Sequence, residues 1–272
     1  MQRFARCLIS VIGAACLAAR ASAQKQKDPG EDIQHIREEL GINAFTAPSI
    51  EVLFEELHAL QPIPFDKAWR DPSEGPPADR PRLALYAGQV IADGFLVVAA
   101  EKQSRIEPIA RLLLKSARGL GVGEHVTRHS KSFLELAARG RWAEVKQELV
   151  RAQADVEAGM MALKDEEIAH LVSLGGWLRG LEITSSVILE DFHPEKARRL
   201  IQPAISDYFS ERFATLNPRF KATALGTTIE KNFVAIRQLT TKTDNASLSA
   251  ADVTQIRDLA REINKAIAAP QE

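Results

Sequence analysis

Apolar residues recur every three or four positions along most of the chain, and this spacing predicts helices. In residues 48–60, for example, Ile50, Leu53, Leu57 and Leu60 fall on one helical stripe. Strand-like alternation of apolar and polar residues is almost absent. The pattern therefore predicts an all-α multi-helix bundle, with helices at residues 31–40, 48–60, 83–100, 108–114, 121–138, 142–170, 171–190, 194–216 (broken at Pro203), 223–239 and 250–268.

Two of these segments, residues 83–100 and 171–190, are almost continuously apolar, which is typical of helices buried at the centre of a bundle. A membrane-spanning helix is the alternative for residues 83–100. Gln89 and Asp93 interrupt that segment, and an aspartate at the centre of a transmembrane helix costs about 3 kcal/mol. The buried helix is therefore the favoured interpretation, without a transmembrane helix in the mature chain.

Prolines divide the chain into a small N-terminal part and a main body. Residues 61–81 contain six prolines, a density that excludes a regular helix or a central strand and predicts a loop or linker. Residues 24–60 are then a polar leader with two short helices, which form a small N-terminal appendage. Residues 82–272 form the helical bundle domain.

The chain also matches part of itself when it is shifted by 86 residues, although chance is the alternative explanation. The matched pairs are Leu85 with Leu171, Gly94 with Gly180, Pro108 with Pro194, and Leu114 with Leu200. The same shift aligns Asp93 with Arg179, inside the two apolar helices. A buried charge is tolerated when it is paired, so these two residues are expected to meet. The pair either fixes the register of two core helices or contributes to a polar ligand pocket.

Small residues near this pair predict a close approach of the two helices. Gly88 with Ala92, and Gly176 with Gly180, are spaced four apart, as in helices that pack closely. Trp177 lies between the glycines of the second helix, and tryptophan and arginine are residue types that often anchor recognition sites. We therefore predict Asp93, Trp177 and Arg179 as ligand-binding residues; packing in the core is the alternative role.

Residues 1–23 have the layout of a secretory signal peptide. Two arginines precede an apolar run of about 13 residues, and Ala21 and Ala23 supply the small residues before a cleavage site. The run is shorter than the roughly 20 residues that span a bilayer. The mature chain is expected to be periplasmic or secreted; in the alternative, Cys16 is acylated and anchors a lipoprotein. Cys7 and Cys16 are the chain's two cysteines, so removal of residues 1–23 leaves no disulfide.

Composition and charge narrow the classes of partner. Hydrophobic residues make up 45% of the chain, charged residues 26%, and the formal net charge is −1. A nucleic-acid-binding protein would be expected to carry a basic patch and a high isoelectric point, so this charge gives no indication of a nucleic-acid partner.

Histidine spacing identifies candidate metal ligands, although no cofactor is predicted with them. Glu167 and His170 form a Glu-x-x-His pair, which carboxylate-bridged dimetal bundles use because both side chains then reach one metal. His125 and His129 are four apart, a spacing that also allows chelation. Hydrogen-bonded packing is the alternative role for each histidine.

These observations favour a non-catalytic binding or scaffold protein of the bacterial cell envelope, whose partner is another envelope protein or a small molecule. Nothing in the motifs indicates an enzyme. A helical bundle that binds a transition metal or acts in redox chemistry is one alternative. A small-ligand binder with a polar pocket between core helices is the other.

Overall fold

The computed structural model describes residues 50–72, 75–241 and 247–269, and within these residues the fold is all-α, as predicted. The predicted signal peptide, leader and first helix lie outside the described residues. In the N-terminal half the helices are α2 (Ile50–Ala59), α3 (Phe65–Ala68), α4 (Arg80–Ala99), α5 (Gln103–Leu120), α6 (Gly123–Ala138) and α7 (Trp142–Leu163). The remainder are α8 (Glu166–Glu190), α9 (Pro194–Ala197), the 3-10 helix η1 (Arg198–Leu200), α10 (Pro203–Thr215), α11 (Pro218–Lys221), α12 (Ala224–Thr240) and α13 (Ala250–Ala268).

Helices α4 and α8 form the centre of the bundle and touch backbone to backbone. A Cβ atom at Gly88 would lie 1.9 Å from the carbonyl oxygen of Val172, and one at Gly175 would lie 2.0 Å from that of Leu85. Only glycine allows helices to approach this closely. The predicted close approach is confirmed at Gly88, but Gly180 has no contact that would exclude a Cβ.

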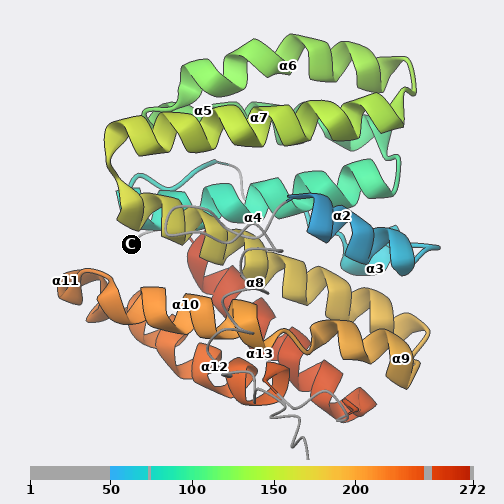
Figure 1. The fold of residues 1–272 in the computed structure, drawn as a ribbon, viewed down its shortest axis with the longest axis vertical. Coiled ribbons are helices and arrows are strands. Elements are labelled where there is room, and N and C mark those ends of the chain that lie inside the picture. The colour runs from blue at the N-terminus through green and yellow to red at the C-terminus, as the bar shows by residue number, and fades with distance from the viewer. Residues whose placement is uncertain (1–49, 73–74, 242–246, 270–272) are drawn as a thin grey trace, which may run out of the picture.

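The other helices form layers on either side of this central pair (Figure 1). Helices α5, α6 and α7 make the upper layer in that view, and α10, α12 and α13 lie below α8. Helix α13 packs directly on α8, and α12 packs on α13. The buried residues form one continuous cluster, which is mainly aliphatic because the chain holds few aromatic residues.

Several predicted helix boundaries are wrong, including both ends of the helix expected at residues 108–114, which is α5 (Gln103–Leu120). The expected helix at residues 142–170 ends at Leu163, because Lys164 adopts a left-handed conformation (φ 52°) and Asp165 caps the next helix by accepting a hydrogen bond from the Ile168 amide. The helix expected to begin at Pro108 begins at Gln103 instead. Burial of Ile106 and Ile109 in its first turns compensates for the one hydrogen bond that a proline cannot donate.

The proline-rich segment contains a short helix that its proline density was expected to exclude. It contains α3, a single helical turn that fits between its prolines, and a cis peptide bond between Gln61 and Pro62. Phe65 and Ala68 of α3, like Leu57 and Leu60 near the end of α2, are buried in the common core. The segment therefore packs on the bundle in the described residues.

The internal duplication is not confirmed. Pro108 lies inside a helix of 18 residues, whereas Pro194 begins a helix of only four.

Among the described helices, α4 alone combines the length and hydropathy needed to cross a bilayer, and 83% of its most apolar window is buried within the protein.

Candidate functional site

Asp93 and Arg179 meet, as the 86-residue shift predicted. The Arg179 guanidinium donates to Asp93 Oδ1 at 2.7 Å and to the Ala68 carbonyl oxygen at 2.8 Å, and it pairs with Glu182 at 2.9 Å. The side chains of Asp93 and Arg179 are each 1% exposed. Burial disfavours the Arg179 charge, but the nearby carboxylates of Asp93 and Glu182 outweigh it and raise the pKa of Arg179.

A polar network extends this ion pair to α13. Arg261 and Asn264 both donate to the Glu182 carboxylate, at 3.0 and 2.9 Å, and Gln89 of α4 donates to Asn264 Oδ1 at 3.0 Å. Burial would raise the pKa of Glu182, but Arg179 and Arg261 lower it below its ordinary value. The network thus joins α4, α8 and α13. Asp93 Oδ2 is buried without a hydrogen bond and lies 3.7 Å from Arg70 Nε. Asp93 Oδ1, Arg179 and Glu182 are paired within the protein, and this pairing favours a structural role over ligand binding at Asp93 and Arg179.

A cavity of about 560 Å³ lies on the other side of the α4–α8 pair, between it and the α5–α6–α7 layer. Its walls are mostly apolar and come mainly from these five helices, with Glu56 of α2 and with Gln202 and Ile205 at the start of α10. Its volume is in the range of about 300–1,000 Å³ that is usual for small-molecule sites. Representative wall residues are Ile91, Phe95, Leu113, Phe133, Leu149 and Val172.

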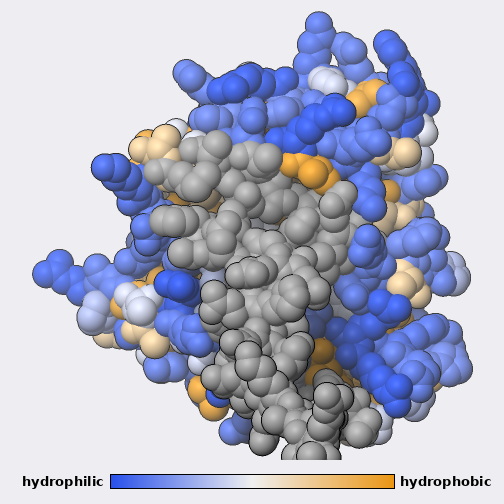
Figure 2. Space-filling model, viewed as in Figure 1, coloured by the Kyte–Doolittle hydropathy of each residue, from blue (hydrophilic) through white to orange (hydrophobic). Residues whose placement is uncertain are grey.

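The helices above the cavity are amphipathic, and their polar faces point outward. Figure 2 shows that the surface over α6 and α7, at the top of the view, is largely hydrophilic. Val126 and Phe133 of α6 and Leu149 of α7 face the cavity instead. The apolar walls are therefore shielded from water by a charged exterior.

Trp177 is the one residue of the predicted ligand-binding trio that lines the cavity; Asp93 and Arg179 do not. Its indole Nε1 donates to Gln202 Oε1 at 3.1 Å. Its ring is tilted against Phe209 and meets Phe233 edge to face, with centroids 5.2 and 5.7 Å away. The hydrogen bond and the rings fix the orientation of the indole. A ligand in the cavity would therefore meet a fixed aromatic wall at Trp177.

His129 brings two carboxylates together beside the cavity. Its Nδ1 lies 3.0 Å from Glu148 Oε1, and its Nε2 lies 3.1 Å from Asp155 Oδ2. The His129 ring thus bridges the two carboxylates through its two nitrogens. Arg151 pairs with Glu148 and Arg128 with Asp155, so this group of charges joins α6 to α7.

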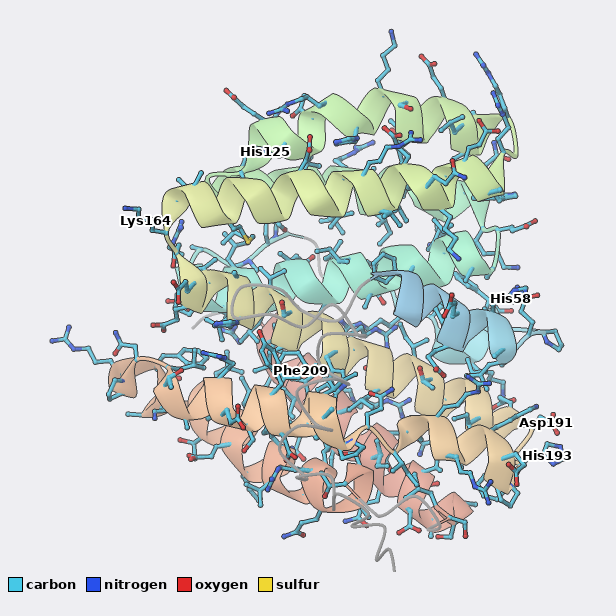
Figure 3. The ribbon with its side chains drawn as sticks, in the orientation of Figure 1. His58, His125, Lys164, Asp191, His193 and Phe209 are labelled. Atoms are coloured by element: carbon cyan, nitrogen blue, oxygen red, sulfur yellow. The ribbon has the colours of Figure 1, made fainter. Side chains whose placement is uncertain are left out.

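The α6–α7 hairpin joins the rest of the molecule at one end of the cavity. Gly121 before α6 and Lys164 after α7 both have positive φ angles, 89° and 52°. Arg80 at the start of α4 contacts both connections, because it donates to the Leu120 carbonyl oxygen at 3.3 Å and to Asp165 at 2.7 Å. Figure 3 shows Lys164 at the bend between α7 and α8.

The structure does not bring the four predicted metal ligands together. His129 faces Glu148 and Asp155, whereas the ring of His125 packs against Gly159 of α7. Glu167 contacts the Asn217 backbone amide at 3.4 Å, and His170 contacts Tyr208. Among the described residues, no group of three or more histidine or acidic side chains is arranged to hold a metal ion.

His170 makes the stability of the fold sensitive to acid. Its Nδ1 lies 2.9 Å from the Tyr208 hydroxyl, and burial, followed by the charge of Arg212, lowers its pKa from 6.5 to about 4. The unfolded chain therefore takes up a proton near pH 6.5 that the folded protein takes up only near pH 4. The free energy of unfolding should fall as the pH decreases through this window, with no further change from His170 below it.

Urea unfolding near pH 7 and near pH 4.5 tests this expectation. The His170→Asn variant keeps a polar group toward Tyr208 but has no imidazole to titrate, so it should lose less stability between the two pH values than the wild type. Equal losses in the two proteins would exclude His170 as the source.

The cavity itself was not predicted from the sequence. Its signal is a row of small residues on the same stripe of a helix: Ala169, Ser173 and Gly176 on α8 are spaced four and three apart and all line the cavity. Such a row predicts close helix packing as readily as it predicts a space between helices. Only the three-dimensional arrangement distinguishes the two outcomes.

No protein-family model matches the chain, no curated protein matches its sequence, and no solved structure matches its fold. The class of protein is therefore described from the fold and the cavity alone. It is an all-α protein with an apolar cavity between a central helix pair and a three-helix layer.

Proposed function

We propose that this chain is a non-catalytic binding protein that holds an apolar small molecule between the α4–α8 pair and the α5–α6–α7 layer. The cavity of about 560 Å³ is the observation that carries the proposal. Protein interiors are normally close-packed, and an empty apolar cavity lowers stability in proportion to its volume. A bound apolar ligand would restore the missing contacts.

The N-terminal sequence supports binding outside the cytoplasm. The basic start, apolar run and small residues of positions 1–23 are those of a signal peptide, so we propose a periplasmic or secreted protein of the cell envelope. Apolar molecules dissolve poorly in an aqueous compartment, so a protein that binds them there would keep them in solution. Mass spectrometry of the mature N-terminus would distinguish a chain that begins at Gln24 from one anchored through an acylated Cys16.

The cavity is tested by filling it. Ile91 of α4 lines the cavity and is partly exposed, so Ile91→Trp places a larger side chain in the space that a ligand would occupy. We expect this variant to bind the neutral hydrophobic dye N-phenyl-1-naphthylamine at least tenfold more weakly than the wild type, measured by fluorescence titration of the delipidated protein.

Val234→Trp provides the matched control. Val234 lies on α12, is 53% exposed and does not line the cavity, so the same type of substitution there should leave dye binding unchanged. A wild-type protein that does not bind the dye, or an Ile91→Trp variant that binds it as tightly as the wild type, would contradict the proposed function.

A further inference from the structure

We infer that the cavity ligand is a single-chain amphiphile with a linear alkyl tail and an anionic headgroup, and that the headgroup lies at Lys164. This inference rests on the proposed apolar-ligand function and adds the chemical class of the ligand. Three features of the cavity support it: the length of its lining along α5 and α8, the place of its exposed charged groups, and the charge of Lys164.

The lining of the cavity follows α5 and α8 along their axes. On α8 its lining extends from Glu166 to Trp177, and on α5 from Ile109 to Leu120. Each run covers a helical rise of about 16 Å. An alkyl chain that lies along the helices would contact the whole of each run.

Polar groups such as Glu56, Glu148 and Gln202 also line the cavity, but its exposed charged residues, Lys164 and Glu166, lie together at one end. Phe95, Ile109 and Phe133, all buried, lie toward the end where α5 begins and α6 ends. At the opposite end, Lys164 and Glu166 line the cavity and are exposed to solvent. An amphiphile would place its tail against the phenylalanines and keep its headgroup hydrated at Lys164.

Electrostatics at the polar end favour an anion. Lys164 is the only lysine or arginine among the described lining residues, and no ion pair to it is formed within the described part of the chain. The carboxylates of Glu56, Glu148 and Asp165, in contrast, are each paired with an arginine. Glu166 is exposed and can remain in water, so the Lys164 ammonium is the charge left for a ligand.

Competition against the bound dye tests this ligand class on the delipidated full-length mature protein. The competitors, used below their micelle concentrations, are dodecanoate, octanoate, dodecanol, dodecyltrimethylammonium and adamantane carboxylate. We expect dodecanoate to bind at least tenfold more tightly than octanoate, because each buried methylene adds to affinity. It should also bind at least fivefold more tightly than dodecyltrimethylammonium at low ionic strength, and more tightly than the compact adamantane carboxylate.

Variants at Lys164 test the position of the headgroup. Lys164→Glu should reverse the preference between dodecanoate and dodecyltrimethylammonium, whereas Lys231→Glu, the same charge change at an exposed site on α12, should not. Lys164→Asn removes the charge with a residue that tolerates the left-handed backbone, and it should abolish the preference even if the glutamate variant does not fold.

The outcomes separate the two proposals. Dye binding without any preference for chain length or for an anionic headgroup, or with a preference that Lys164→Asn does not change, would overturn the amphiphile inference and leave apolar binding intact. A protein that binds neither the dye nor any competitor would instead contradict the proposed function itself.

Discussion

Gly175→Ala is expected to destabilise the protein severely, by about 4 kcal/mol or more, because the added methyl group would meet the α4 backbone. The new Cβ would lie 2.0 Å from the Leu85 carbonyl oxygen and 2.8 Å from the Leu85 Cα atom. Backbone atoms cannot rotate away as a flexible side chain can, so the two central helices would have to separate. The free energy of unfolding, measured by urea denaturation, reports the effect.

Gly180→Ala on the same helix is the control. No atom lies within 4 Å of a Cβ at Gly180, and alanine restricts the unfolded chain more than glycine does. This variant should therefore gain about 0.5–1 kcal/mol. Similar stabilities for the two alanine variants would show that α4 and α8 are not in backbone contact at Gly175.

Asp93→Ala is expected to lower the free energy of unfolding by about 3–5 kcal/mol, because it leaves the buried Arg179 guanidinium without its 2.7 Å partner. The double variant Asp93→Leu/Arg179→Met replaces both charges by apolar groups. Because burial of an ion pair costs desolvation energy, the double variant should be markedly more stable than Asp93→Ala alone.

The comparison of single and double variants decides the interpretation. A double variant that is less stable than Asp93→Ala would show that the other partners of Arg179, the Ala68 carbonyl and Glu182, hold the helices as strongly as Asp93 does. Far-ultraviolet circular dichroism should first establish that each variant is helical.

Much of the helical architecture is predictable because local signals mark the helix ends. The last helix begins where predicted, since Ser249 and Asp252 form the expected capping box. The boundary between α7 and α8 was missed because no glycine or proline marks it. Asp165 caps α8 there, yet a charged run such as residues 164–167 also occurs on the exposed face of a continuous helix.

The site was only partly predictable, for a physical reason. The contact between Asp93 and Arg179 follows from sequence because two opposite charges in apolar helices must find each other. The cavity depends on how far the α5–α6–α7 layer stands from α4 and α8, and no local pattern encodes that distance. Trp177 was predicted to bind a ligand, and its place in the cavity wall is consistent with that prediction, which remains to be tested.

The chain connects the α6–α7 hairpin to the rest of the protein at one end only, and we expect this to allow the hairpin to open locally. Both connections of the hairpin, at Gly121 and Lys164, lie beside Arg80, while the backbone contact between α4 and α8 lies elsewhere. Local unfolding can involve one cooperative unit while the rest of a protein stays folded. Here such an opening would expose the cavity without breaking the buried ion pair, so substitutions in the hairpin can change ligand exchange independently of global stability.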